Sequence, residues 1–98
     1  MKAVAKTRPA AGLEIIDVEE PQLRPGCVKL RVEHGSVCGT DLHIYNWDPW
    51  AANRIHPPRV VGHEFCGTVV EVASDVQTHR VGDYVASESH IVCNECKQ

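Results

Sequence analysis

The chain of 98 residues is long enough for a single hydrophobic core and too short to add a second domain of the kind that binds a dinucleotide. Its formal net charge is -3, and its charged residues, 23% of the total, are spread along the sequence without a basic cluster. Because phosphate binding needs clustered Lys and Arg, and because no apolar run approaches the length of a membrane span, we expect neither a nucleic-acid partner nor a membrane partner.

The N-terminal residues do not resemble a secretion signal, since Lys2, Lys6 and Arg8 interrupt what would have to be an apolar run. We therefore expect a cytoplasmic protein. In that reducing compartment cysteines act as ligands, nucleophiles or small core residues more often than as disulfides. The five cysteines are Cys27, Cys38, Cys66, Cys93 and Cys96.

The first third of the sequence is typical of short strands separated by turns. Residues 2–6 and 13–19 have strand composition, and the Pro and Gly at 9–12 predict a turn between them. A second turn is predicted at 21–26, where two prolines suit neither a helix interior nor a central strand. Aliphatic and charged residues then alternate at 28–33, which predicts a strand with one face in the core and the other in solvent.

The middle of the sequence changes character. Residues 40–45 have the composition of one or two helical turns, and the prolines at 49 and 57–58 would prevent that helix from extending far. We predict an exposed loop at 50–56, between these prolines.

Strand character returns in the last third, at 60–72 and at 81–86, with a turn predicted at 73–78. Gly62 and Gly67 mark points where the backbone bends or another strand approaches closely. Many short strands with almost no helix predict a mainly β fold, an antiparallel barrel or sandwich.

Candidate metal ligands lie in two separate stretches. Cys38 alone would most simply be a small core residue, and His63 beside Glu64 a solvated pair. Together they offer the thiolate, imidazole and carboxylate ligands that zinc favours, and a catalytic zinc site uses three protein ligands with one open position. Cys38, His63 and Glu64 would form such a set if two loops converge at one rim of the barrel.

Thr40 and His43 are three positions apart, so their side chains would lie on the same side of a helical turn. One interpretation is a capping Thr and a surface His. The other is a proton relay, in which the hydroxyl contacts a metal-bound alcohol and the imidazole passes the proton to solvent, a role that histidine often has in enzymes.

Cys93 and Cys96 form a C-x-x-C pair, which is typical of half a structural zinc site or of a redox pair. No βαβ pattern surrounds the pair, so a thioredoxin-like role is disfavoured. A four-thiolate zinc site would need two further ligands. Cys27 and Cys66 are available, but their strand contexts favour plain core residues.

Tyr45, Trp47 and Trp50 are close together in a chain with only 5% aromatic residues. They would form either a small satellite core under a loop or the lining of a pocket or oligomer contact.

Several of these motifs, taken together, resemble the medium-chain alcohol dehydrogenases. GHEFCG at 62–67, followed by Ala73 and Val76, resembles that family's zinc signature, and CGTD at 38–41 resembles its first zinc ligand and relay hydroxyl. VGD at 81–83 is similar to a strand start common in the family. The resemblance covers nearly the whole chain.

The resemblance implies a GroES-like antiparallel barrel with short helical turns, forming an incomplete N-terminal catalytic domain over residues 1–98. It implies a Rossmann domain in a longer protein, usually a homotetramer. Residues 38–50 and 88–93 narrow the resemblance to members that oxidise the 3-hydroxyl of L-threonine with NAD, giving 2-amino-3-oxobutanoate. The 98 residues alone are then expected to be inactive.

The resemblance also implies residue roles. Cys38 and His63 match the catalytic zinc ligands, and Glu64 matches a position that is either a ligand or a close neighbour able to exchange onto the metal. Thr40 and His43 match the proton relay.

Three later residues are also given roles by the resemblance. His90 falls in a segment near the substrate pocket. Cys93 and Cys96 match the first two of four structural zinc ligands, a site that these residues alone leave half complete.

Two alternatives remain open. A polyol or simple alcohol dehydrogenase would share the zinc and relay residues and differ in its pocket. A non-catalytic zinc-binding GroES-like interaction module would depend mainly on Cys93 and Cys96, and would have no use for Thr40 and His43 at their spacing.

Overall fold

The structure of the protein is a computed structural model, which describes residues 1–88. His90, Cys93 and Cys96 lie outside these described residues. The elements are β1 (Lys2–Lys6), β2 (Glu14–Asp17), β3 (Val28–Gly35), α1 (Gly39–Asn46), α2 (Pro49–Arg54), β4 (Arg59–Val60), β5 (Phe65–Val72) and β6 (Tyr84–Ala86).

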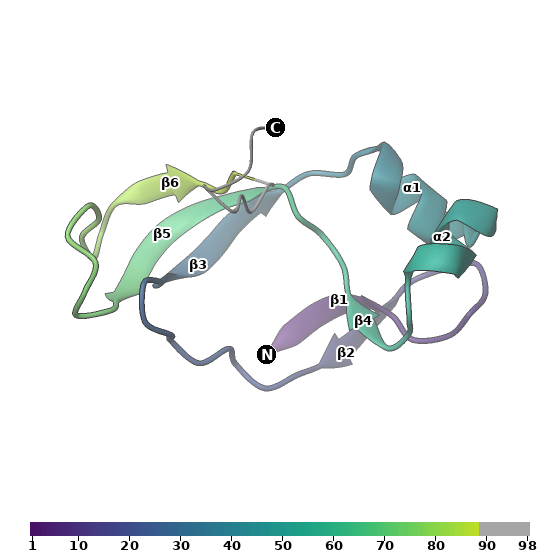
Figure 1. Ribbon diagram of the computed structural model, residues 1–98, viewed down its shortest axis with the longest axis horizontal. Coiled ribbons are helices and arrows are strands. Elements are labelled where there is room, and N and C mark those ends of the chain that lie inside the picture. The colour runs from purple at the N-terminus through teal and green to yellow at the C-terminus, as the bar shows by residue number, and fades with distance from the viewer. Residues whose placement is uncertain (89–98) are drawn as a thin grey trace, which may run out of the picture.

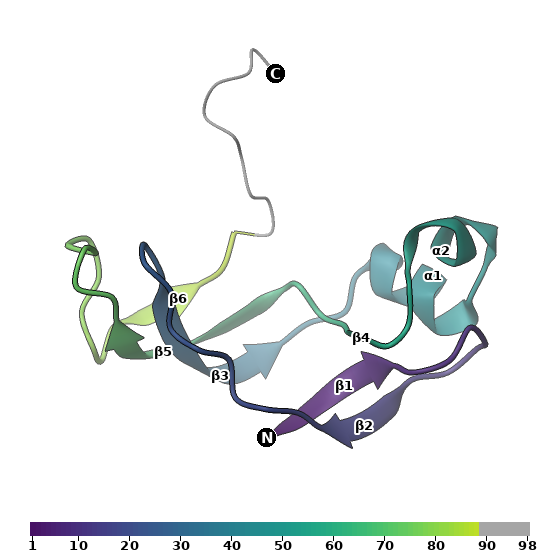
Figure 2. The ribbon, with the colours of Figure 1, turned by 60° about the horizontal axis from the view of Figure 1, so that its bottom comes forward.

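The strands form two antiparallel sheets of three strands each, in the orders β2-β1-β4 and β3-β5-β6. The sheets lie next to each other, and α1 and α2 pack together near the end of the β2-β1-β4 sheet (Figures 1 and 2). The chain passes between the sheets more than once, which brings residues that are far apart in the sequence together at the junction. None of the helices in the described part of the chain has the length and apolar character needed to cross a membrane.

The mainly β prediction is confirmed, and so is a helix after the third strand. The exposed loop predicted at 50–56 is wrong, because α2 occupies most of it. The Asp48 side chain accepts a hydrogen bond from the Ala51 backbone N–H at 3.0 Å, and Pro49 stands at the first helical position. Proline is favoured there because that position has no intrahelical use for an N–H. The strand predicted at 81–86 is shorter, since only Tyr84–Ala86 is extended and paired.

Few apolar side chains are buried among the described residues. The buried ones are Ala5, Ile44, Ala51, Val69 and Ala73.

The alternation predicted for residues 28–33 therefore does not produce the expected buried face. Val32 is 58% exposed, and together with Val28, Leu30 and Phe65 it lines an open cavity of about 900 Å³. One extent of the described fold is only 20 Å, against 42 and 38 Å for the other two. A thin molecule leaves much of its apolar sheet surface accessible to water or to another covering segment.

Lys6 is the largest fully buried side chain within residues 1–88, although its charge predicts the solvent face. Its ammonium donates hydrogen bonds to the carbonyl oxygens of Ala10 at 2.6 Å, Gly12 at 2.5 Å and Tyr45 at 3.5 Å. It also lies 5.3 Å from the ring centre of Trp47. These contacts join the turn after β1 to the C-terminal end of α1, where helix carbonyls lack partners and cations are favoured.

Burial lowers the pKa of the Lys6 ammonium, and the neighbouring charge of Arg8 lowers it further. The lowered pKa means that desolvation of the ammonium offsets part of the stabilisation that its hydrogen bonds contribute. Hydrogen bonds to a charged group contribute about 1.5–3 kcal/mol, so the net contribution of Lys6 should be smaller than their sum.

We expect Lys6→Met to lower the free energy of unfolding by about 1–2 kcal/mol, because the methionine keeps the packing volume and removes the ammonium donor from the Ala10 and Gly12 carbonyl oxygens. Urea denaturation followed by circular dichroism measures the change. Lys2→Met on the same strand is the control, since Lys2 forms only an exposed pair with Asp17 at 3.0 Å. Equal losses for the two variants would contradict this structural role for Lys6.

Candidate metal centre

Two links, one after β3 and one after β4, meet at the junction of the two sheets. Residues 36–38 connect β3 to α1, and residues 61–64 connect β4 to β5. The backbone N–H of Ser36 donates to the carbonyl of Glu64 at 2.9 Å, which fixes the links against each other. Gly62 has φ of +102°, a conformation that glycine adopts without steric cost, so the backbone bends there as the sequence predicts.

Cys38 and His63, one on each link, are brought into contact. The Cys38 sulfur lies 3.0 Å from Nε2 of His63, although the residues are 25 positions apart. Both residues are half-buried, so the pair is partly shielded from water and still reachable. The thiolate and imidazole expected to bind zinc are thus adjacent, as the convergence of two loops requires.

Asp41 is a functional candidate that sequence reasoning missed. It is 8% exposed, and its Oδ2 accepts the Cys38 backbone N–H at 3.1 Å, so it caps the start of α1. Its Oδ1 lies 3.8 Å from Nδ1 of His63 and has no hydrogen-bond partner within residues 1–88. An acidic residue three positions after the N-cap, here Cys38, is a capping signal that could have identified it.

The residues present fit a zinc ion. Ligand atoms of Cys38, Asp41 and His63 all lie within 4.8 Å of one another, and thiolate, carboxylate and imidazole are the groups that zinc binds. A carboxylate behind a histidine ring is also a common support for a metal ligand, since it holds Nδ1 protonated and leaves Nε2 free for the metal. The unpartnered Asp41 oxygen suits either role.

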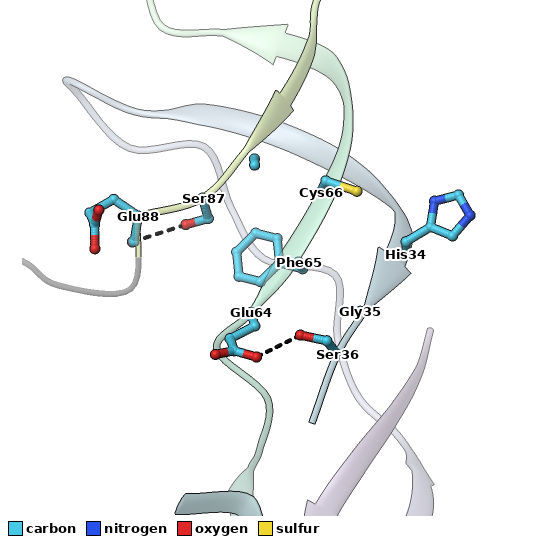
Figure 3. A pocket seen from close by; sticks show the side chains of 9 residues that line it. His34, Gly35, Ser36, Glu64, Phe65, Cys66, Ser87 and Glu88 are labelled. Atoms are coloured by element: carbon cyan, nitrogen blue, oxygen red, sulfur yellow. Dashed lines mark hydrogen bonds between the residues drawn. The ribbon is translucent and has the colours of Figure 1, made fainter. Parts of the chain in front are cut away.

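Glu64 does not join this cluster. Its carboxylate accepts a hydrogen bond from the Ser36 hydroxyl at 2.5 Å, as Figure 3 shows. It lines an open cavity of about 460 Å³ together with Ser36, Phe65 and Ser87. Its role as a zinc ligand or neighbour stays a prediction, and reaching the Cys38 and His63 pair would require the side chain to leave Ser36.

Thr40 and His43 both lie on α1, three positions apart, with Thr40 half-buried and the His43 side chain 53% exposed. Nδ1 of His43 contacts Oδ2 of Asp48, and the His43 ring lies 5.4 Å from the Trp50 ring, tilted by 40°. The hydrogen bond from the Ala51 backbone, followed by that from His43, lowers the pKa of the Asp48 carboxyl. Asp48 is therefore a carboxylate near neutral pH.

The aromatic residues at 45–50 do not form one cluster. Trp47 ends α1 with φ of +53° and contacts Lys6, whereas Trp50 contacts His43 and the Arg54 guanidinium at 5.0 Å. Tyr45 is 51% exposed.

The expectation that Cys27 and Cys66 are plain core residues is wrong for Cys27, which is exposed at the entry to β3. Cys27 directly follows the turn formed by Pro25 and Gly26. Cys66 is half-buried, and its sulfur lies 3.1 Å from the Tyr84 hydroxyl. This hydrogen bond is the main cause that raises the pKa of Tyr84.

Comparison with known protein families identifies the fold. The model of the family described as the alcohol dehydrogenase GroES-like domain matches residues 24–98. The chain belongs to this family.

The relatives of this GroES-like domain are dehydrogenases. L-threonine 3-dehydrogenase from Thermococcus kodakarensis is 51% identical over 96 residues, covering 98% of this chain and 27% of the relative. The chain therefore spans about a quarter of the length of the curated relatives it matches.

Two solved structures have similar folds. Zinc dependent alcohol dehydrogenase 2 from Streptococcus pneumonia, in its apo form, has a TM-score of 0.83 at 30% identity, over 99% of this chain and 27% of its own. A short chain alcohol dehydrogenase from E. coli CFT073, in complex with NADH, has a TM-score of 0.80 at 34% identity, over 99% and 27%. These likenesses confirm the GroES-like fold and the resemblance stated from the motifs.

Proposed function

We propose that residues 1–98 are the N-terminal part of the catalytic domain of a zinc-dependent L-threonine 3-dehydrogenase, which oxidises L-threonine to 2-amino-3-oxobutanoate with NAD in a longer protein. The observation that carries the proposal is the contact of Cys38 with His63 at 3.0 Å, beside a helix that presents Thr40 and His43. The similarity to L-threonine 3-dehydrogenases at about half identity supports this substrate over a polyol or simple alcohol.

Cys38 and His63 would hold the zinc, and Asp41 would orient His63 from behind or complete the ligand set. When bound, zinc supplies a Lewis acid that lowers the pKa of a substrate hydroxyl. Glu64 would then be a neighbour of the zinc that can exchange onto it as a ligand, and its carboxylate would otherwise accept the hydrogen bond from Ser36.

The relay residues follow from the position of α1. Thr40 would accept the hydroxyl proton and His43, half exposed, would deliver it to solvent. Once the hydroxyl proton is removed, the carbon that bears this oxygen can release a hydride to NAD.

The remaining parts of the proposal concern the longer protein. The open cavity beside β3 and the exposed side chains of Val32 and Val60 support a covering segment that completes the domain. We include a Rossmann domain for NAD, a homotetramer, a cytoplasmic location, a substrate contact by His90, and a structural zinc at Cys93 and Cys96.

The test measures NADH formation by the full-length enzyme with L-threonine, sorbitol and ethanol. We expect kcat/KM for L-threonine to exceed kcat/KM for sorbitol or ethanol by at least about 100-fold. A site that binds the charged groups of an amino acid has polar groups of its own that stay unpaired when sorbitol or ethanol is bound. A preference for sorbitol or ethanol would replace threonine dehydrogenase with the corresponding alternative.

Residues 1–98 assayed alone serve as the control for the role of the remainder. We expect no steady NADH production from them, since the printed sequence carries no glycine-rich nucleotide motif. Turnover by this segment would contradict the division of labour proposed here.

A further inference from the structure

Asp48 uses its two carboxylate oxygens for different partners. Oδ1 accepts the Ala51 backbone N–H at 3.0 Å and so caps α2, while Oδ2 contacts Nδ1 of His43. The Asp48 backbone N–H also donates to the His43 carbonyl at 3.4 Å. His43 on α1 is thus joined to the start of α2 through both its ring and its backbone.

The partner of Nδ1 determines the state of the other ring nitrogen. A carboxylate can only accept a hydrogen bond, so Nδ1 of a neutral His43 ring must carry the hydrogen. Nε2 then has a free lone pair and is the atom able to take up a proton. Which nitrogen carries the hydrogen is therefore assigned from the partner of Nδ1.

The His43 ring also has an aromatic neighbour. Trp50 lies against it with 5.4 Å between ring centres, and Arg54 lies 5.0 Å from the centre of the Trp50 ring. The His43 ring therefore contacts two residues at the start of α2: Asp48, which its capping bond to Ala51 holds in place, and Trp50.

We propose that Asp48 is a positioning residue that holds His43 with Nδ1 protonated and Nε2 free to accept the proton. This inference rests on the proposed relay role of His43 for its effect on turnover, but the arrangement of the ring itself does not depend on that role. It extends the relay from a pair of residues on α1 to a third residue at the start of α2.

Asp48→Asn separates the capping bond from the contact with His43. Asparagine is as good a helix cap as aspartate, and its amide oxygen must face the Ala51 N–H, which needs an acceptor. The NH₂ group then faces Nδ1 of His43, which is forced to accept, and the hydrogen moves to Nε2. The variant therefore keeps the cap of α2 while the hydrogen of the His43 ring moves from Nδ1 to Nε2.

The readout is ¹⁵N NMR of histidine-labelled, zinc-loaded full-length enzyme at about pH 8.5, where an ordinary imidazole is neutral. The His43 signals are assigned by their loss in His43→Gln. We expect the Nδ1–H form in the unmodified enzyme and the Nε2–H form in Asp48→Asn. We also expect kcat to fall by about 10-fold to 100-fold with KM changed less than about threefold, as for loss of a proton-transfer group.

Two further variants keep the test decisive. Asp17→Asn makes the same chemical change in an exposed pair with Lys2 and should leave the spectrum and kcat unchanged. Asp48→Ser retains a capping hydroxyl without reaching His43, and should give a mixture of the two ring forms even if Asp48→Asn fails to fold.

An Nδ1–H ring that persists in Asp48→Asn, or in Asp48→Ser when the first variant does not fold, overturns the proposal. A hydrogen that moves to Nε2 in Asp48→Asn without any change in kcat would also overturn the proposal. The nitrogen that carries the hydrogen would then not matter for turnover. Absence of threonine turnover in the unmodified enzyme would instead defeat the proposed function, while the NMR comparison would still judge how Asp48 holds the ring.

Discussion

Replacing Cys38 with serine in the full-length enzyme is expected to remove the catalytic zinc and with it the oxidation of threonine. The Cys38 sulfur is 3.0 Å from Nε2 of His63, and a serine hydroxyl is a far poorer zinc ligand than a thiolate. Losing a Lewis acid that contributes several kcal/mol corresponds to about a thousandfold fall in kcat/KM, at about 1.4 kcal/mol for each factor of ten. Elemental analysis and NADH formation measure the two effects.

Cys27→Ser is the matched control for this prediction. Cys27 is exposed, and it does not belong to the cluster formed by Cys38, Asp41 and His63 in the described part of the chain. We expect its zinc content and activity to match those of the unmodified enzyme. If Cys38→Ser folds and keeps the same zinc content, the assignment of Cys38 as a ligand is wrong.

Gly67→Ala is expected to destabilise the fold by about 3 kcal/mol, because overpacking against a fixed backbone costs about 1–3 kcal/mol and sometimes more. An added Cβ at Gly67 would lie 2.1 Å from the carbonyl oxygen of Arg31 and 3.0 Å from the Cα of Val32. Both are backbone atoms of the paired strand β3, so no side-chain rotation can relieve the clash. Urea denaturation measures the loss of stability.

Gly39→Ala is the comparison for Gly67→Ala. Gly39 is the first residue of α1, its added Cβ would meet no atom within 4 Å, and alanine favours a helix over glycine by up to about 1 kcal/mol. This variant should be as stable as the unmodified protein or slightly more so. A similar loss in both variants would mean that the close approach of β3 to Gly67 is not the cause.

Local sequence signals predicted strands and α1 well, because alternation and turn residues act over a few positions. They did not predict α2, although Asp48 followed by Pro49 is itself a helix-start signal, because the prolines at 49 and 57–58 are also typical of a loop. They also failed at Val32, where alternation was correct and burial was not, since burial depends on what covers the sheet.

Local sequence signals also predict only part of the candidate site. Spacing alone predicts that Thr40 and His43 lie on one side of a helix. Ligand chemistry proposes that Cys38 and His63 share a site across 25 positions, but their contact depends on how the two links converge, which local patterns do not show. Capping signals mark Asp41 and Asp48 as helix-start residues, but their contacts with the rings of His63 and His43 depend on the folded structure, which no local pattern records.

The two links that carry Cys38 and His63 are short, three and four residues long at 36–38 and 61–64. An extra residue in an extended link adds about 3.3 Å of chain, which exceeds the 3.0 Å between the sulfur and the ring nitrogen. One insertion or deletion in either link would therefore part the two donors even if every side chain were kept, whereas the turn at 73–78 can vary in length without this effect. Loop length in this chain is as specific a requirement as the identity of the ligands.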